Sequence, residues 1–283
     1  MSTVIVFCVV GGLALLLGLV YVRPDWWYLF TSSFHKKAMA MGETGEVLWE
    51  SYSIEELKEM QQVTWNQSLM LINTEYMLDE SFVPETGEYQ DSGVTMNACI
   101  MDAYRRLAAQ VYQKYGNKLY ISSAYRDKEK QAWLYAEDPQ TATVPGASEH
   151  ESGLCLDVYV KNYSGDGFLK SPEGQFVNSN CHKFGFIIRY PHYGEDNTGI
   201  RFEPWHIRYV GEPHATYIYN NSLTLEEYIS GLEEGVCYDT EEYYVTRQLE
   251  VDGKIAVPAA CDSYIISPDN TGSYIITGKK TVR

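Results

Sequence analysis

Basic side chains are scarce in this sequence. Of its 283 residues, 22 are Lys or Arg against 38 Asp or Glu, which gives a formal net charge of −16 at pH 7. A charge of this sign repels nucleic-acid phosphates and anionic lipid headgroups alike. The composition therefore excludes a nucleic-acid-binding protein of the usual basic kind. With this net charge, an anionic substrate can bind only where a basic side chain is present locally.

Internal repeats and low-complexity stretches are absent as well, and cysteine is limited to six residues. Hydrophobic residues make up 45% of the chain and charged residues 21%, which indicates a globular core and excludes a disordered polymer. Cys8 lies in an apolar run and Cys155 in a histidine-containing motif. The other four cysteines allow three pairings, and the sequence does not choose between these pairings and free thiols.

The first 22 residues contain no Lys or Arg, and Val4 to Val22 form a run of 19 consecutive apolar residues. A helix of that length can cross the hydrocarbon core of a bilayer, and the run is longer than the apolar core of a usual signal peptide. Arg23 ends the run, and Trp26 and Trp27 follow where a membrane interface would lie. Residues 1–23 are therefore predicted to form an uncleaved transmembrane anchor.

Two short segments carry side chains that suit a metal ion. They are Ser148-Glu149-His150-Glu151-Ser152-Gly153-Leu154-Cys155-Leu156-Asp157 and Glu203-Pro204-Trp205-His206. Two imidazoles and one carboxylate, from His150, His206 and Asp157, are ligands of borderline hardness that suit zinc. Three protein ligands leave the fourth tetrahedral position free for a water molecule, which is the arrangement of a catalytic zinc site.

The spacing of these residues predicts loops and strands around the metal. His150 and Asp157 are seven residues apart with Gly153 between them, whereas paired histidines on a helix lie one turn apart. The apolar run 154–160 is typical of a buried strand, so His150 is expected on the loop entering the strand and Asp157 within it. Residues three apart face opposite ways in a strand, so a turn at Pro204 is expected to bring Glu203 and His206 to the same metal.

Glu203 is the candidate catalytic base. Zinc lowers the pKa of its bound water to about 7, so a nearby carboxylate can take the proton and later pass it to a leaving amine. This pairing of metal and carboxylate predicts metal-dependent peptide hydrolysis.

Both segments resemble the sequence pattern of the VanY-type D-alanyl-D-alanine carboxypeptidases, a family of zinc peptidases. That pattern is Ser-x-His-x-x-Gly-x-Ala-x-Asp followed by Glu-x-x-His. The resemblance covers roughly residues 65–230 and includes two further stretches, Ser123-Ala124-Tyr125-Arg126 and Arg208-Tyr209-Val210-Gly211. It implies that His150, Asp157 and His206 bind zinc and that Glu203 is the base.

The resemblance also implies that Arg126 binds the carboxylate of the substrate. A planar guanidinium holds a carboxylate through two parallel hydrogen bonds, which suits recognition of a free C-terminus. Further candidate substrate-binding residues are Tyr125, Gln131, Ser148 and Trp205. A loop-capping role for Ser148 and a packing role for Trp205 remain open alternatives.

Cys155 stands where the family pattern has alanine. Residues two apart in a strand share a face, so the Cys155 thiol can point to the same side as Asp157. One interpretation is a small buried cysteine that replaces alanine in the core. The other is a fourth metal ligand, which would close the site and favour a structural zinc.

The predicted fold class is α+β, with a mixed or antiparallel sheet flanked by helices and zinc in a cleft. Helices are expected from Asn97 to Gly116, from Asp127 onward, and over 175–184 and 223–234. Strands are expected through Ile121, in the first motif, and over 186–189 and 206–210. The predicted domains are the anchor 1–23, a juxtamembrane spacer 24–60, a carboxypeptidase domain 61–234 and a small β-rich appendage 235–283.

The function implied by the resemblance is a zinc-dependent D,D-carboxypeptidase that removes the terminal D-Ala from peptidoglycan stem peptides ending in D-Ala-D-Ala. An L,D-carboxypeptidase of the same fold, acting on tetrapeptide stems, is one alternative, and a non-catalytic zinc-bearing wall-binding module is another. Cell-wall peptide lies outside the cell, so we expect a single-pass membrane protein with an external catalytic domain. Arg23, Lys36 and Lys37 follow the apolar run, which by the positive-inside tendency favours the opposite orientation.

Overall fold

The computed structural model describes residues 22–32, 36–44, 47–259 and 261–281, together with residues 18 and 34. The predicted transmembrane helix over residues 4–22 lies outside the described residues, except at residues 18 and 22. Within the described part of the chain, no helix combines the length and the apolar character needed to cross a membrane.

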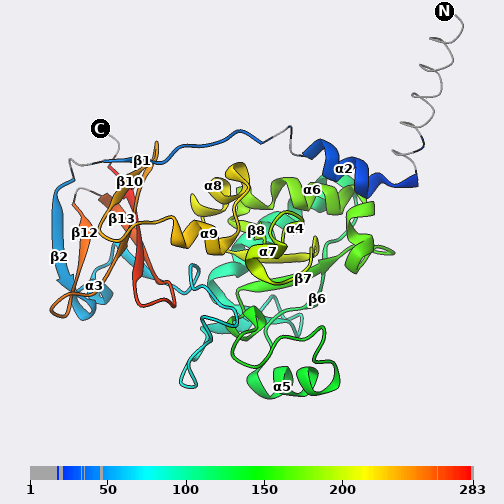
Figure 1. Cartoon of the computed structure of the whole chain (residues 1–283), viewed down its shortest axis with the longest axis horizontal. Coiled ribbons are helices and arrows are strands. Elements are labelled where there is room, and N and C mark those ends of the chain that lie inside the picture. Colours follow the sequence, from blue (N-terminus) through cyan, green and yellow to red (C-terminus); the bar gives the residue numbers. More distant parts are fainter. Residues whose placement is uncertain are drawn as a thin grey trace, which may run out of the picture.

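A four-stranded antiparallel sheet lies at the centre of the molecule (Figure 1). Its strand order is β6-β7-β9-β8. Its strands are β6 (Tyr120–Ser123), β7 (Cys155–Tyr159), β8 (Phe186–Ile188) and β9 (His206–Tyr209). Each strand coincides with an apolar run from which the sequence predicts a strand. The antiparallel pairing of β7 with β9 places Asp157 directly opposite His206, so the two sequence segments meet in the middle of the sheet.

The helix α4 (Met101–Tyr115) covers this sheet and confirms the helix predicted between Asn97 and Gly116. A short 3-10 helix, η2 (Ala98–Ile100), precedes α4, and the side chain of Asn97 accepts a hydrogen bond from the backbone N–H of Cys99. Gly116 ends α4 in the left-handed conformation (φ 73°) that favours glycine. The buried face of the helix packs into the main core through Ala103, Tyr104, Leu107 and Val111.

Other short elements surround the sheet. The predicted helix over 223–234 is shorter in the structure, because a capping box at Thr224 starts α9 and the helix ends at Gly231. The surrounding elements are β4 (Thr86–Glu88), β5 (Thr95–Asn97), α5 (Lys128–Glu137), η3 (Glu149–Ser152), η4 (Gly165–Lys170), α6 (Pro172–Asn180), η5 (Cys181–Phe184), α7 (Glu195–Thr198), α8 (His214–Asn221) and α9 (Leu225–Ser230).

A second, β-rich unit is built from both ends of the described chain. Its six-stranded sheet has the order β1-β10-β11-β14-β13-β3, and a separate ladder joins β12 to β2. The predicted spacer 24–60 therefore differs from the structure, because part of it forms strands that pair with the C-terminal residues. These elements are β1 (Gly42–Glu43), β2 (Trp49–Ser53), α3 (Ile54–Glu59), β3 (Val63–Trp65), β10 (Cys237–Asp239), β11 (Tyr243–Gln248), β12 (Lys254–Pro258), β13 (Cys261–Pro268) and β14 (Tyr274–Lys280).

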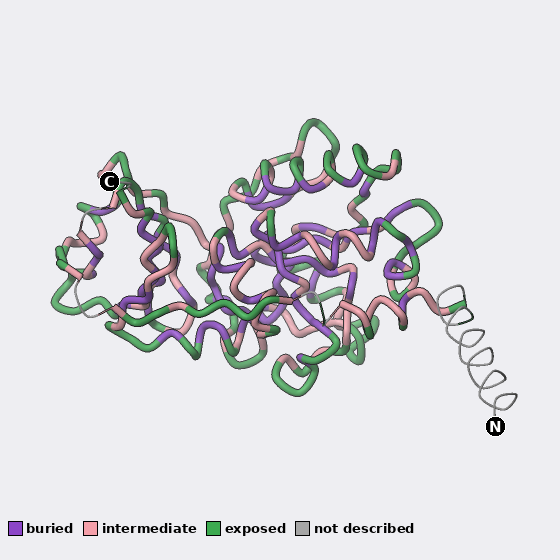
Figure 2. Tube along the Cα trace, turned by 90° about the horizontal axis from the view of Figure 1, so that it is seen from above, coloured by how far each residue is buried: buried purple, intermediate pink, exposed green. Residues whose placement is uncertain are grey.

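An extended segment, residues 36–41, joins the two units along the outside of the molecule (Figure 1), and the burial colouring of the chain shows that it is not buried (Figure 2). It is held by hydrogen bonds from Lys36 Nζ to Ser222 Oγ (3.0 Å) and from the Met39 N–H to Asn221 Oδ1 (3.1 Å). Before it, α2 (Pro24–Ser32) docks on α6, where the Tyr28 and Ser179 hydroxyls lie 2.8 Å apart. The segment that follows the apolar N-terminal run is thus fixed to the central unit.

The two units share one apolar core. Leu225, Tyr228 and Ile229 of α9 pack with Val245 of β11 and Ile275 of β14, and all five residues are buried. Polar contacts reinforce this junction. His214 lies between the Tyr228 hydroxyl, 2.6 Å from Nδ1, and the Thr277 hydroxyl, 2.8 Å from Nε2. The junction is therefore part of the folded core.

Burial lowers the pKa of His214 to about 3, which predicts a pH-dependent stability. The folded state keeps His214 neutral, whereas the unfolded chain binds a proton as the pH falls below about 6.5, so stability is present above that pH and lost below it. At pH 5 we expect this residue to lower the free energy of unfolding by about 2 kcal/mol. The fall in the unfolding free energy between pH 8 and pH 5, measured with denaturant, is expected to be about 2 kcal/mol larger in the native protein than in His214→Gln. An equal loss in both proteins would contradict the prediction.

Candidate metal and substrate site

Asp157 connects the two predicted metal-binding segments. Its Oδ1 lies 3.0 Å from Nδ1 of His206, the residue opposite it on β9, and its Oδ2 lies 3.3 Å from Nε2 of His150. The two imidazole rings stand nearly perpendicular, with their centroids 5.1 Å apart. The structure thus brings the three predicted ligands together, with the Asp157 carboxylate in contact with both imidazoles.

His150 is positioned by the 3-10 helix η3 and by Gly153, which ends it. Gly153 has a φ of 69°, and a Cβ at this position would lie 2.8 Å from the backbone nitrogen of Asn97, so both conformation and space require glycine. His150 Nδ1 donates a hydrogen bond to the carbonyl of Ala124 (2.7 Å). In a neutral imidazole this leaves Nε2, the nitrogen that faces Asp157, free to bind a metal.

Glu203 lies beside the same group of side chains. The predicted turn at Pro204 is present: the N–H of His206 donates to the carbonyl of Glu203 (3.1 Å), and Asn178 Nδ2 holds the carbonyl of Pro204 (2.8 Å). The turn places Glu203 Oε2 3.9 Å from His206 Nδ1. Burial raises the pKa of Glu203, which makes it a stronger base than an exposed carboxylate.

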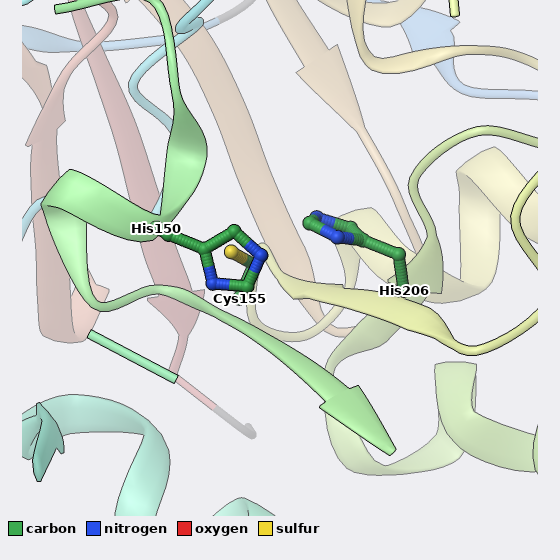
Figure 3. Close-up of side chains that lie close together, drawn as sticks. All are labelled: His150, Cys155 and His206. Carbon is green, nitrogen blue, oxygen red and sulfur yellow. The ribbon is translucent and has the colours of Figure 1, made fainter. Parts of the chain in front are cut away.

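The Cys155 thiol also lies at this site. One donor atom from each of His150, Cys155 and His206 falls within 4.8 Å of the others, and all three residues are buried. Figure 3 shows the two rings and the sulfur converging from η3, β7 and β9. Sequence spacing correctly placed the thiol on the face of β7 that carries Asp157. The described residues therefore present a carboxylate and a thiol beside the same pair of imidazoles.

The charges of these groups favour a cation between them. Burial acts to lower the pKa of His150, but Cys155 and Asp157 outweigh it and raise this pKa to about 9. Burial likewise acts to raise the pKa of Asp157, but the two imidazoles hold it well below its usual range. The site thus attracts positive charge, and its donors are nitrogen, oxygen and sulfur atoms that suit zinc.

Arg126 lines a cavity of ≈ 140 Å³. Tyr125, Lys128 and Glu151 also line it, and the buried Nε of Arg126 has no hydrogen-bond partner among the described residues. The backbone N–H of Arg126 donates to the carbonyl of His150 (3.1 Å), so the arginine is tied to the turn that carries a predicted metal ligand. Arg126 and Lys128 are the cations of this lining, beside the carboxylates of Asp79, Glu80 and Glu151, and they are the groups there that can bind an anion.

Three further predicted substrate-binding residues take other positions. Gln131 is buried on α5, where its Nε2 donates to the carbonyl of Thr143 (2.6 Å). Ser148 is buried just before η3, and its backbone carbonyl accepts from the N–H of Glu151 (3.1 Å). Trp205 is half-buried and packs against the main core. None of the three lines the cavity beside Arg126, and their substrate roles stay predictions.

A buried charge network beneath the site was not predicted from the sequence. Glu149, next to His150 in the first motif, accepts hydrogen bonds from Arg189 Nε (2.7 Å) and Arg208 Nη1 (2.6 Å). All three side chains are at most 1% exposed. The arginines lie 40 and 59 positions further along the chain, so local spacing gave no signal beyond the adjacency of Glu149 to His150.

Comparisons with known proteins identify relatives of this chain. Residues 93–212 match the protein family described as VanY, D-alanyl-D-alanine carboxypeptidase. A D-alanyl-D-alanine carboxypeptidase of Enterococcus faecium is 35% identical over 197 residues, which cover 66% of this chain and 62% of that protein. The chain thus aligns with somewhat less than two thirds of that relative.

Two solved structures share the mixed α+β fold. The first is the D,D-pentapeptidase VanY of a VanB-type resistance cassette in complex with Zn(II), which is 30% identical with a TM-score of 0.51 and matches 57% of this chain and 98% of that chain. The second is the D,D-dipeptidase VanXYg with a D-Ala-D-Ala phosphinate analogue, with a TM-score of 0.65 over 83% of this chain and 100% of that chain. At 23% identity the second match shows the fold alone.

Proposed function

Because this chain belongs to the VanY family of D-alanyl-D-alanine carboxypeptidases, we propose that it is a zinc-dependent D,D-carboxypeptidase that removes the terminal D-Ala from peptidoglycan stem peptides. The observation that carries this proposal is the contact of both the His150 and the His206 imidazole with the Asp157 carboxylate, with Glu203 beside them. Such a donor set holds zinc with one position left open, and it is the arrangement of hydrolytic rather than structural sites.

In this proposal His150 Nε2, the Asp157 carboxylate and His206 Nδ1 hold the metal. Zinc, when bound there, supplies a Lewis acid that polarises the scissile carbonyl and acidifies water. Glu203 takes a proton from the attacking water and returns it to the leaving amine, and its burial supports this role by raising its pKa. A single carboxylate thereby serves both as base and as acid during one turnover.

Arg126 is proposed to make the enzyme specific for the C-terminal end of a peptide. Its Nε has no partner of its own, so a substrate carboxylate entering the cavity can pair with the guanidinium through two parallel hydrogen bonds. A peptide amide at the same place offers no negative charge. Arg126 therefore favours a free C-terminal residue and positions the preceding peptide bond toward the metal-binding residues.

The substrate class is tested by mass spectrometry of stem peptides incubated with the zinc-loaded protein. A pentapeptide stem ending in D-Ala-D-Ala is expected to lose one alanine and stop at the tetrapeptide, because the site is proposed to act on the D,D bond. A tetrapeptide substrate in a parallel reaction is the control. Cleavage of the tetrapeptide with an intact pentapeptide would favour the L,D-carboxypeptidase alternative.

The Cys155 thiol favours one further alternative, a closed and non-catalytic zinc site. The thiol lies among the same donors as the two imidazoles, and a thiolate in the fourth position would leave no room for water. Asp157 argues for the open site, because its two oxygens face both imidazoles and complete a three-ligand set without sulfur. We therefore propose the open site, with Cys155 as a neighbour of the metal.

We also propose that residues 1–23 anchor the protein in the cell membrane and that the catalytic domain is external. Two features support the anchor: the apolar run up to Val22, and the exposure of Trp26 (56%) and Phe30 (64%) on the helix that follows. The substrate supports the orientation, because cell-wall peptide lies outside the membrane. Labelling of intact cells with a membrane-impermeant lysine reagent tests it, and protection of all lysines until lysis would oppose it.

A further inference from the structure

Glu149 is a fully buried carboxylate that lies next to His206, one of the proposed metal ligands. Its Oε1 receives both arginine hydrogen bonds, from Arg189 Nε and Arg208 Nη1. Arg189 also donates to both carboxylate oxygens of Glu226 (2.8 and 2.6 Å). The two arginines and the two glutamates balance in charge, so Glu149 is held as an anion in a fixed position.

Both arginines are themselves fixed. Arg208 donates to the carbonyls of Ser68 (3.1 Å), Met70 (2.8 Å) and Tyr209 (3.1 Å), and it is completely buried. With the orientation of both guanidinium groups set, the carboxylate plane of Glu149 has little freedom. Its second oxygen, Oε2, therefore points in a direction that the arginines determine.

That second oxygen faces His206. Glu149 Oε2 lies 3.5 Å from His206 Nε2, and neither atom has a hydrogen-bond partner of normal geometry elsewhere in the described chain. Both are buried, where an unpaired polar atom is costly. The opposite nitrogen of the same ring, Nδ1, faces Asp157 Oδ1 at 3.0 Å and Glu203 Oε2 at 3.9 Å.

We propose that Glu149 is a positioning residue that selects the metal-binding nitrogen of His206. A neutral imidazole carries one proton, and the nitrogen that binds a metal cannot carry it. Glu149 accepts the Nε2 proton, so Nδ1, the nitrogen that is hydrogen-bonded to Asp157, is the one that loses its proton when a metal binds. The inference rests on the proposed metal-binding role of His206 and adds the residue that sets its orientation.

The tautomer of the other histidine, His150, is also set by a hydrogen-bond acceptor, but a different one. The carbonyl of Ala124 accepts the Nδ1 proton of His150 and leaves Nε2 toward Asp157. The two imidazoles therefore present opposite nitrogens to the metal, and each is set by the acceptor behind it. A backbone carbonyl does this for His150 and a buried anion for His206.

Nuclear magnetic resonance of the zinc-loaded protein tests the inference directly. In protein labelled with nitrogen-15 histidine, long-range proton–nitrogen spectra distinguish the protonated nitrogen of each ring from the metal-bound one. The signals of His206 are assigned by their loss in His206→Gln. We expect a protonated Nε2 and a metal-bound Nδ1. A metal-bound Nε2 overturns the inference and leaves the proposed function intact, whereas a His206 ring that binds no zinc opposes the proposed function itself.

The substitution Glu149→Gln supplies the second measurement. Its amide can still accept from the arginines but presents N–H groups toward Nε2, which favours the wrong tautomer. We expect the zinc affinity, measured by competition with a chelator, to fall by about 10- to 100-fold. Glu173→Gln is the matched control, because Glu173 is also buried but accepts its hydrogen bond from Asn117 Nδ2 (2.6 Å), which is not a predicted ligand.

A purely structural role for Glu149 makes a different prediction. It would lower the melting temperature of Glu149→Gln while leaving the zinc affinity of the folded fraction equal to that of Glu173→Gln, and this result overturns the inference. The variant Cys155→Ala tests whether the thiol, rather than Glu149, holds the Nε2 proton of His206. The Nε2 proton signal is expected to persist in this variant. Its loss would assign the proton to the thiol. If Glu149→Gln fails to fold, the spectra of the unsubstituted protein still decide.

Discussion

Replacing Glu203 by alanine is expected to lower kcat by a factor on the order of 10² or more on a pentapeptide stem ending in D-Ala-D-Ala. The substitution removes the group proposed to accept and return the proton. It leaves His150, Asp157 and His206 in place, since Glu203 lies 3.9 Å from the nearest imidazole nitrogen and is not among the proposed ligands. Zinc content and the affinity for zinc are therefore expected to remain near those of the unsubstituted protein.

Steady-state kinetics and elemental analysis of the same preparation separate these two effects. Glu241→Ala, at an exposed carboxylate just before β11 in the second unit, is the matched control and is expected to retain full activity. Near-normal turnover in Glu203→Ala would refute its assignment as the base. Loss of zinc together with loss of activity would instead make Glu203 a ligand.

Replacing Arg126 by alanine is expected to lower kcat/KM by about 10²-fold or more, since each hydrogen bond to a charged group contributes about 1.5–3 kcal/mol and two are lost. Arg126→Lys is expected to recover only part of this loss, because an ammonium offers a point charge rather than a planar fork. The measurement is kcat/KM for the pentapeptide and for its C-terminal amide.

The amide makes the test specific for the carboxylate. The unsubstituted protein is expected to cleave the amide poorly, and Arg126→Ala is expected to cause little further loss on it, because the interaction is already absent. Arg105→Ala serves as the control, because Arg105 is an exposed arginine paired with Asp102 on α4. Equal losses on the acid and the amide would show that Arg126 acts elsewhere than on the substrate carboxylate.

The metal-binding residues could be predicted from the sequence because local rules determine much of their placement. Gly153 and Pro204 mark the two turns, and the apolar run between 154 and 160 forms the strand that carries Asp157. The family pattern then identifies which of the polar residues bind the same metal ion. The direct pairing of Asp157 with His206 on neighbouring strands explains why two segments far apart in sequence form one site.

Non-local partners explain what the sequence did not predict. The buried anion at Glu149 depends on an arginine in β9 and on another directly after β8, whose positions follow only from the folded sheet. Likewise, β2 pairs with β12 about two hundred residues away, so residues taken as a spacer form part of the second unit. Short strands of this kind carry little pattern of their own, because their partners determine whether they form.

The most direct test of the proposed site is a crystal structure of the zinc-loaded protein with anomalous difference maps recorded on both sides of the zinc absorption edge. A single peak is expected about 2.0–2.2 Å from His150 Nε2, an Asp157 oxygen and His206 Nδ1, with water in the fourth position. A peak bonded to the Cys155 sulfur as a fourth protein ligand, or no peak between these three side chains, would contradict an open hydrolytic zinc site.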